Sequence, residues 1–160
     1  MVQALYPNEL QSSELILEFQ GHAPHRFLQE PTYHFWMIEP ASGQVAGRIN
    51  LRDSHTELVE RYAGHIGYGV EEAFRGRRLA LHAVEMLKPL AFRLGLNPLW
   101  ITCDPANLAS RRICELAGGE MVEEVKIPEN NLMYAGGARE KCRYRIDLGE
   151  QYRFLDRTAS

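Results

Sequence analysis

The chain has 160 residues, a formal net charge of −3 at pH 7 and 45% hydrophobic residues. This composition suits one domain with a buried core, placed over residues 1–160, and argues against disorder and against a general nucleic-acid binder, which would be basic. No apolar run is long enough to span a membrane, and the N-terminus lacks the basic-then-apolar pattern of a signal peptide. The chain has three cysteines, an odd number, at the widely spaced positions Cys103, Cys114 and Cys142. We therefore expect a cytoplasmic domain with reduced thiols, no disulfide framework and no structural zinc.

The first part of the chain is rich in strand signals. Residues 13–20 alternate apolar side chains on one face, and residues 32–52 hold two β-prone runs around the turn "PASG", which indicates a hairpin. Residues 21–31 are interrupted by proline and predict a loop. Residues 53–63 predict either a short helical turn or an irregular loop, and residues 64–70 predict a strand weakened by its glycines.

The middle of the chain predicts two helices. Apolar residues recur at three- and four-residue steps over residues 77–94, and Pro89 should bend this helix rather than end it. A second helix lies within residues 104–119, capped by Asn107 or by Asp104.

The remaining segments complete the predicted sheet. Residues 99–103 form a short buried strand, and residues 120–127 and 141–148 form two more strands, joined by the long loop 128–140. This order predicts an α/β fold with a mixed, mostly antiparallel central sheet. The strand–helix–strand unit over residues 65–103 should be a right-handed parallel crossover.

The turn before the first helix, "RGRR", is unusual for its charge. Arg75, Arg77 and Arg78 stand at a helix N-terminus, where the helix dipole favours anions rather than cations. Free backbone N–H groups, arginine side chains and the flexible Gly76 together suit a phosphate or pyrophosphate group. The alternative is that the arginines form surface ion pairs with Glu71, Glu72 and Glu85. The P-loop and the dinucleotide-binding glycine fingerprints are both absent.

The strand that leads into this turn carries glycines on one face. His65, Gly67 and Gly69 alternate with Ile66, Tyr68 and Val70. Glycine inside a strand marks close approach by a ligand or by another part of the protein. The pattern therefore predicts either an extended ligand along the strand or a bulge or close packing contact.

These segments resemble one protein family. "RGRRLA" (residues 75–80) resembles the [Q/R]xxGx[G/A] pyrophosphate loop of the GNAT acetyltransferase superfamily. "NLASRRICELAGG" (residues 107–119) resembles the NxASxRxxExxGG helix of the branch that includes ribosomal-protein and small-molecule N-acetyltransferases. The resemblance is best over residues 32–120, and the order of elements agrees with the GNAT fold.

The resemblance implies a central β-α-β unit that binds acetyl-CoA as acyl donor, without a metal. The residues that it places at the acetyl-CoA are Tyr68, Gly69, Val70, Arg75, Gly76, Arg77, Arg78, Leu79, Ala80, Asn107 and Ser110. Two features depart from the family pattern. Arg78 stands where glycine is usual, and residues 21–31 leave room only for reduced N-terminal helices.

Acetyl transfer to an amine requires a deprotonated amine, a polarised thioester carbonyl and a proton for the leaving thiolate. By the resemblance, a backbone N–H of residues 68–70 would hold the carbonyl. His65, with an unperturbed pKa of about 6.5, is the candidate base. Cys114, with an unperturbed pKa of about 8.5, stands where relatives place a general acid. Both have a structural alternative, as a strand histidine satisfied by its neighbours and as a small buried hydrophobe.

The expected function is acetyl transfer from acetyl-CoA to a primary amine of an unidentified small-molecule or peptide acceptor, by direct attack on the thioester. The rival is a catalytically silent acyl-CoA binding or sensing module. Residues 21–31 and 128–140 are the candidate acceptor-selecting loops, and the acidic run before the second loop favours a cationic acceptor. No nucleic acid or membrane partner is expected, and the chain acts either alone or as a homodimer.

Overall fold

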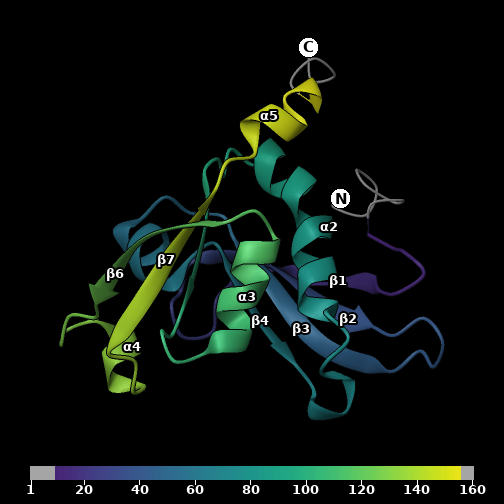
Figure 1. The fold of residues 1–160 in the computed structure, drawn as a ribbon, viewed down its shortest axis with the longest axis horizontal. Helices are drawn as coiled ribbons and strands as arrows, with labels where there is room; N and C mark the ends of the chain where they lie inside the picture. Colours follow the sequence, from purple (N-terminus) through teal and green to yellow (C-terminus); the bar gives the residue numbers. More distant parts are fainter. Residues whose placement is uncertain (1–9, 156–160) are drawn as a thin grey trace.

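The computed structural model describes residues 10–155, and Figure 1 shows its elements. The strands form two sheets, and every pair within them is antiparallel. The first sheet has the order β1–β2–β3–β4, with bounds Ile16–Pro24, Pro31–Ile38, Val45–Arg52 and Ile66–Val70. The second has the order β5–β7–β6, with bounds Leu99–Cys103, Glu140–Ile146 and Glu120–Lys126.

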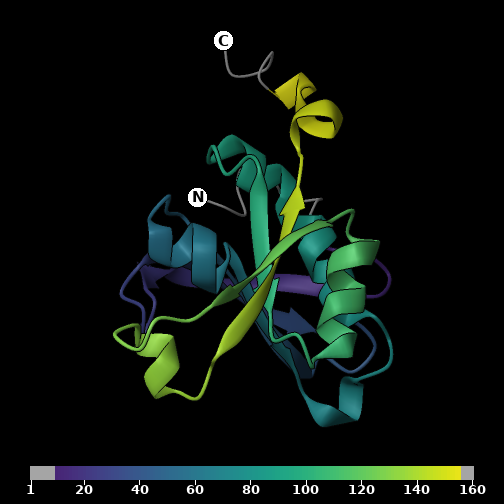
Figure 2. The ribbon, with the colours of Figure 1, turned by 60° about the vertical axis from the view of Figure 1, so that its left-hand side comes forward.

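The helices lie between and after these strands. The two long ones are α2 (Leu79–Arg93) and α3 (Leu108–Leu116). The short ones are the π-helical η1 (Leu58–Ala63), the 3₁₀-helical η2 (Glu72–Phe74), α4 (Leu132–Ala135) and α5 (Gly149–Tyr152). In Figure 2, η1 and α4 lie to one side of β5 and β7, and α3 lies to the other.

The predicted fold class is confirmed, but the two strands of the predicted β-α-β unit do not pair in one sheet. In residues 10–155, β4 and β5 belong to different sheets. One backbone bond joins them, from the His65 N–H to the Trp100 carbonyl at 2.7 Å. The ladder stops there because the Trp100 N–H donates to His65 Nδ1, at 2.9 Å, instead of to a backbone carbonyl of β4. The pairing of β5 is instead completed by β7.

The core is built by the apolar face of α2 against the first sheet. Leu79, Ala83, Leu87 and Leu90 are buried at three- and four-residue spacing, as the sequence predicts. Pro89 lies inside α2 without ending it.

Lys88 is a buried charge that the sequence pattern does not reveal. It is only 5% exposed, and its Nζ donates to the Ala117 carbonyl and to Glu85 Oε1, each at 2.7 Å. Lys88 therefore braces the middle of α2 against the end of α3, and the two helices are held side by side (Figure 1).

The segment between β1 and β2 is shorter than the predicted loop 21–31, because residues 21–24 belong to β1 and Pro31 begins β2. Within the described part of the chain it consists of a turn, with no helix, which agrees with the expected reduction of the N-terminal helices. Residues 53–63 take the helical alternative, as η1. No helix among residues 10–155 is long and apolar enough to cross a membrane. The N-terminal residues used to argue against a signal peptide, 1–9, lie outside the described residues.

Candidate functional site

A cavity of about 640 Å³ lies between β4, the arginine turn and the helices α2 and α3. Its lining residues are Tyr68, Gly69, Val70, Phe74, Arg75, Gly76, Arg78, Leu79, Ala80, Asn107, Ala109, Ser110, Arg112, Ile113 and Leu116. The structure thus brings together around one cavity every residue predicted to bind acetyl-CoA except Arg77. The contact of these residues with a ligand stays a prediction.

The lining strand β4 has an unpaired edge. Backbone bonds from the Arg52 N–H and from the Glu71 N–H mark the two ends of the β3–β4 pairing. Because bonded and non-bonded pairs alternate in an antiparallel ladder, these bonds place the Gly69 N–H toward β3. The N–H groups of Tyr68 and Val70 then point to the free edge of β4. Of the three candidate donors to a thioester carbonyl, Tyr68 and Val70 are therefore the available ones.

The glycine face of β4 has a structural explanation at one position. A Cβ built on Gly67 would lie 2.5 Å from the guanidinium of Arg52, so Gly67 makes room for a buried side chain rather than for a ligand. A Cβ on Gly69 would meet nothing within 4 Å. The close-packing alternative is thus correct at Gly67.

The start of α2 has the backbone geometry of an anion site. Arg78 is the N-cap, in the left-handed region with φ 55° and ψ 31°, and its side chain makes no capping hydrogen bond. The first-turn N–H groups, which belong in part to the lining residues Leu79 and Ala80, have no carbonyl within the helix to bind. Gly76 has φ 87°, which glycine adopts without strain.

The three arginines of the turn have different roles. Arg75 lines the cavity and donates from Nε to the Val70 carbonyl at 3.1 Å, and Arg78 also lines it. Arg77 instead pairs with Glu39 and lies over the ring of Phe74, 5.4 Å from its centroid. The ion-pair alternative is therefore correct for Arg77, with Glu39 as partner in place of the acidic residues expected.

The start of α3 presents two polar groups to the cavity. Asn107 is the N-cap, and its Oδ1 accepts the Ser110 N–H at 3.1 Å, which settles the choice between Asn107 and Asp104. The Ser110 Oγ accepts a hydrogen bond from the Tyr68 hydroxyl at 3.0 Å. A hydroxyl pair therefore connects β4 to α3 across the cavity wall.

Cys114 lies behind this wall. Its side chain is 0% exposed in the main hydrophobic core and does not line the cavity. A hydrogen bond with Cys103 and burial raise the pKa of the Cys114 thiol, and the same hydrogen bond lowers the pKa of Cys103. The role of Cys114 as acid stays a prediction, although this geometry favours packing.

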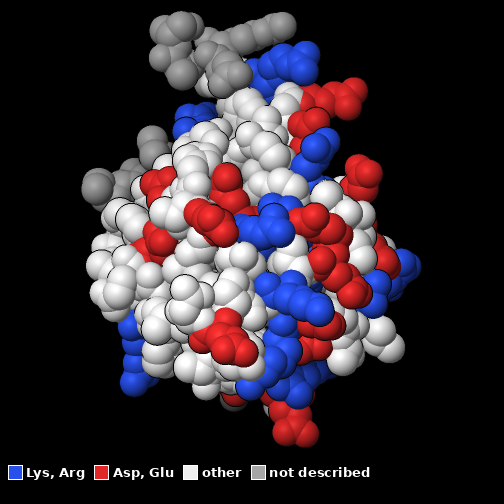
Figure 3. Space-filling view, turned by 90° about the vertical axis from the view of Figure 1, so that its left-hand side faces the viewer, with Lys and Arg blue, Asp and Glu red and all other residues white. Residues whose placement is uncertain are grey.

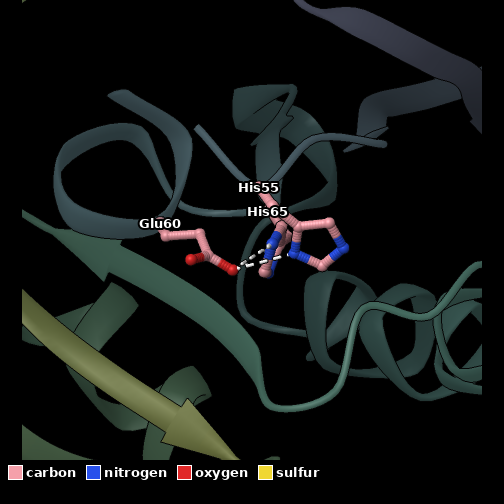
Figure 4. A group of neighbouring side chains, drawn as sticks. All are labelled: His55, Glu60 and His65. Atoms are coloured by element: carbon pink, nitrogen blue, oxygen red, sulfur yellow. Dashed lines mark hydrogen bonds and ion pairs between the residues drawn. The ribbon is translucent and has the colours of Figure 1, made fainter. Parts of the chain in front are cut away.

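His65 immediately precedes β4, and its backbone N–H binds Trp100 of β5. Figure 4 shows the side chain of His65 beside those of His55 and Glu60. The His65 side chain is fully buried, and burial lowers its pKa to about 4. Nδ1 accepts the Trp100 N–H, so the ring proton of the neutral histidine is on Nε2. The single lone pair that a base would use is therefore already engaged. The role of His65 as base stays a prediction, and the structure gives it a second role as the link between two sheets.

The same tautomer decides what the neighbouring cluster can bind. His55, Glu60 and His65 each offer a ligand atom, all within 4.8 Å of one another. Glu60 Oε2 lies 3.0 Å from His55 Nδ1 and 3.9 Å from His65 Nε2. Because Nε2 carries the proton, it can donate toward the carboxylate but cannot ligate a metal while Trp100 is bound.

Sequence reasoning missed three lining residues on α3. Ala109, Ile113 and Leu116 line the cavity, and their spacing of four and three places them on one helix face. Arg112 also lines the cavity. The helical spacing of i+4 and i+7 from Ala109 would have found Ile113 and Leu116.

A second, smaller hollow of about 340 Å³ lies between η1 and the segment 128–140, one of the two segments predicted to select the acceptor. Its lining residues are Glu57, Leu58, Tyr62, Pro128, Asn130, Asn131 and Leu132. Figure 3 shows Lys and Arg side chains in a band on this side of the molecule, bordered by Asp and Glu. Glu123, from the acidic run, pairs with both Arg61 and Arg143. This pairing weakens the argument from the acidic run for a cationic acceptor.

Comparison with known proteins agrees with the fold. The family model described as an acetyltransferase (GNAT) domain matches residues 2–120. The chain therefore belongs to the GNAT acetyltransferase family.

Solved structures show the same fold at low sequence identity. A GNAT-family acetyltransferase from Bacillus anthracis is 23% identical, with a TM-score of 0.56 over 72% of this chain and 66% of that one. A ribosomal-protein-S5-alanine acetyltransferase from Vibrio fischeri is 18% identical, with a TM-score of 0.57 over 72% and 61%. The microcin C7 self-immunity acetyltransferase MccE, solved with acetyl-CoA and AMP, is 16% identical, with a TM-score of 0.57 over 72% and 61%.

A curated relative matches only a short stretch. Bovine nicotinate phosphoribosyltransferase (Bos taurus) is 40% identical over 57 residues, which are 36% of this chain and 10% of that protein. The chain thus spans a tenth of this relative and less than two thirds of several structural relatives.

Proposed function

We propose that the protein is an acetyl-CoA-dependent N-acetyltransferase that transfers an acetyl group to a primary amine of a small molecule or peptide. The observation that carries this proposal is the single cavity that joins the free edge of β4, the arginine turn and the start of α3. Family membership and the acetyl-CoA bound to the structurally similar MccE support the choice of donor.

The residues of the cavity divide the binding of acetyl-CoA between them. Arg75, Arg78 and the first-turn N–H groups of α2 would hold the phosphates, because fixed donors and positive charge suit phosphate oxygens. The free N–H groups of Tyr68 and Val70 would bind the remainder of the donor along β4. One of them would polarise the thioester carbonyl, since a fixed N–H stabilises the oxyanion that develops during attack.

The reaction is direct transfer. The neutral amine attacks the carbonyl carbon, the C–N bond forms, and the C–S bond breaks with its electron pair left on sulfur. The product amide loses one proton and the thiolate gains one, so the reaction needs no other reagent. The loops 21–31 and 128–140 are proposed to select the amine, because they flank the strands and are separate from the donor-binding residues.

Two measurements test the proposal in sequence. Calorimetry should show binding of acetyl-CoA and CoA, and both should raise the melting temperature by mass action. A screen of amino acids, polyamines, aminoglycosides and short peptides, followed by release of CoA, should then find an acceptor.

Two results would contradict the proposal. Without CoA binding, the donor assignment fails. Tight CoA binding without turnover on any amine identifies the silent acyl-CoA binding module instead.

A further inference from the structure

We propose that the Tyr68 hydroxyl is the proton donor to the leaving thiolate, with Ser110 as the group that supports it. This inference rests on the proposed acetyl transfer and assigns one chemical step within it. The thiolate must be protonated, and neither predicted catalytic side chain lines the cavity.

The position of Tyr68 meets the first requirement for a donor, which is access to the reacting atoms. Tyr68 and Ser110 both line the cavity, from β4 and from α3. The backbone N–H of Tyr68 lies on the free edge of β4, where a thioester carbonyl would accept it. One residue thus offers a backbone donor for the carbonyl oxygen and a side-chain donor within the same cavity.

The hydroxyl pair meets the second requirement, which is a stable place for the negative charge. The Tyr68 hydroxyl now donates to Ser110 Oγ at 3.0 Å. Hydroxyl hydrogens rotate freely, so the Tyr68 O–H can turn to sulfur while the Ser110 O–H turns to the tyrosine oxygen. Ser110 lowers the pKa of Tyr68, whereas burial, the larger effect, raises it. Tyr68 therefore stays protonated at neutral pH, and Ser110 stabilises its ionised form.

The proton transfers balance over one turnover. As the C–S bond breaks, the proton of Tyr68 passes to sulfur and forms the thiol of CoA. The tyrosinate then regains a proton from the acetylated nitrogen, directly or through solvent. The alternative donor, Cys114, is less suited because its thiol is enclosed in the core and does not line the cavity.

Tyr68→Phe tests the donor, because it removes the oxygen and keeps the ring. The first measurement needs no acceptor: the thiol of CoA bound to the protein is titrated by the ultraviolet absorbance of its thiolate. A hydroxyl that donates to the sulfur favours the thiolate, so Tyr68→Phe should raise the pKa of bound CoA by about one unit. Ser110→Ala should raise it by less.

The second measurement is turnover with an amine from the acceptor screen. Tyr68→Phe should lower kcat by about 100-fold, the ordinary contribution of a general acid, with a small change in the Kd for acetyl-CoA. The matched control is Tyr33→Phe in β2, which removes the same atom from a tyrosine packed against Phe19 and His22 and away from the cavity. It should match the wild type in both measurements.

The outcomes separate this inference from the proposed function. If CoA binds and Tyr68→Phe leaves both the thiol titration and kcat unchanged, Tyr68 is not the donor while the acetyltransferase proposal stands. If CoA binds but no amine is acetylated, the proposed catalysis fails, and the titration still decides whether Tyr68 contacts the sulfur. If CoA does not bind, both proposals are overturned.

Discussion

The two ends of the junction between β4 and β5 differ in whether their polar groups are already hydrogen-bonded within the protein. At one end, His65 is fully buried, and its backbone N–H and ring Nδ1 both bind Trp100. At the other end, Tyr68 and Val70 have backbone N–H groups on a free strand edge beside a cavity. The histidine has the more reactive side chain by type, but its lone pair is committed to structure. Availability of a lone pair or proton, rather than residue type, therefore separates the candidate catalytic end from the structural end.

The largest effect on stability should come from removing the His65 side chain at the structural end of the junction. His65→Ala leaves the buried Trp100 N–H without an acceptor and should lower the free energy of unfolding by about 3 kcal/mol. His65→Asn places Oδ1 near the position of Nδ1 and should recover much of this loss, whereas His65→Gln, which imitates Nε2, should not. Urea unfolding at pH 8 measures all three variants. Better recovery by Gln would mean that Nε2, toward Glu60, is the atom that matters.

The same residue predicts a dependence on pH. Its pKa is about 4 in the folded protein against the ordinary 6.5, so the unfolded chain binds the proton more tightly. The contribution of neutral His65 to stability is thus complete above about pH 6.5 and is lost as the pH falls toward about 4, by about 3 kcal/mol in total. His65→Asn should show a shallower loss over this window, measured by unfolding at a series of pH values.

The next largest effect, on CoA affinity, should come from removing the two cavity-lining arginines that are proposed to bind phosphate. Arg75→Ala combined with Arg78→Ala should weaken CoA binding about 100-fold, because two charge-assisted hydrogen bonds are removed. Arg77→Ala is the matched control, since Arg77 pairs with Glu39 outside the cavity lining, and should change the Kd little. A phosphate-free pantetheine analogue should bind the double variant and the wild type alike. Equal weakening by Arg77→Ala would contradict the assignment of that arginine to Glu39.

A smaller effect on stability should come from Lys88, which links α2 to the end of α3. Lys88→Met keeps a long side chain but leaves the Ala117 carbonyl without its donor, which should cost about 2 kcal/mol of stability. Since Lys88 holds α2 against α3, CoA affinity should fall as well. Glu85→Ala removes the more exposed partner and leaves the bond to the Ala117 carbonyl in place, so it should cost less than Lys88→Met. Thermal unfolding and calorimetry distinguish the two, and equal losses would assign the brace to the ion pair.

The smallest expected change in stability comes from replacing Arg78, whose backbone lies in the left-handed region. The left-handed backbone costs a residue with a Cβ about 1–2 kcal/mol, and the flexibility of glycine in the unfolded chain offsets about 0.5–1 kcal/mol of this. Arg78→Gly should therefore raise the melting temperature by a few degrees. It should also weaken CoA binding about tenfold, through the loss of one phosphate contact. A variant that is more stable and binds CoA as tightly as the wild type would show that the Arg78 side chain does not reach the phosphates.

The sequence by itself determined what depends on neighbours in the chain. Periodicity located α2, α3 and most strands, local signals narrowed the cap of α3 to Asn107 or Asp104, and the arginine turn marked the start of α2. The residues around the cavity were predictable because they lie on two short segments, the β4–α2 turn and the start of α3, that line one cavity.

Only the tertiary structure decided which of those groups are free to act. The partners that matter are distant in the chain: Trp100 lies 35 residues from His65, Glu39 lies 38 from Arg77, and Ser110 lies 42 from Tyr68. Each bond is short-ranged, so a periodic pattern, which records only the face that a residue takes in its own element, cannot encode it. Folding therefore engages the histidine lone pair, directs Arg77 to Glu39 and leaves the Tyr68 hydroxyl at the cavity, because it fixes which groups come within bonding distance.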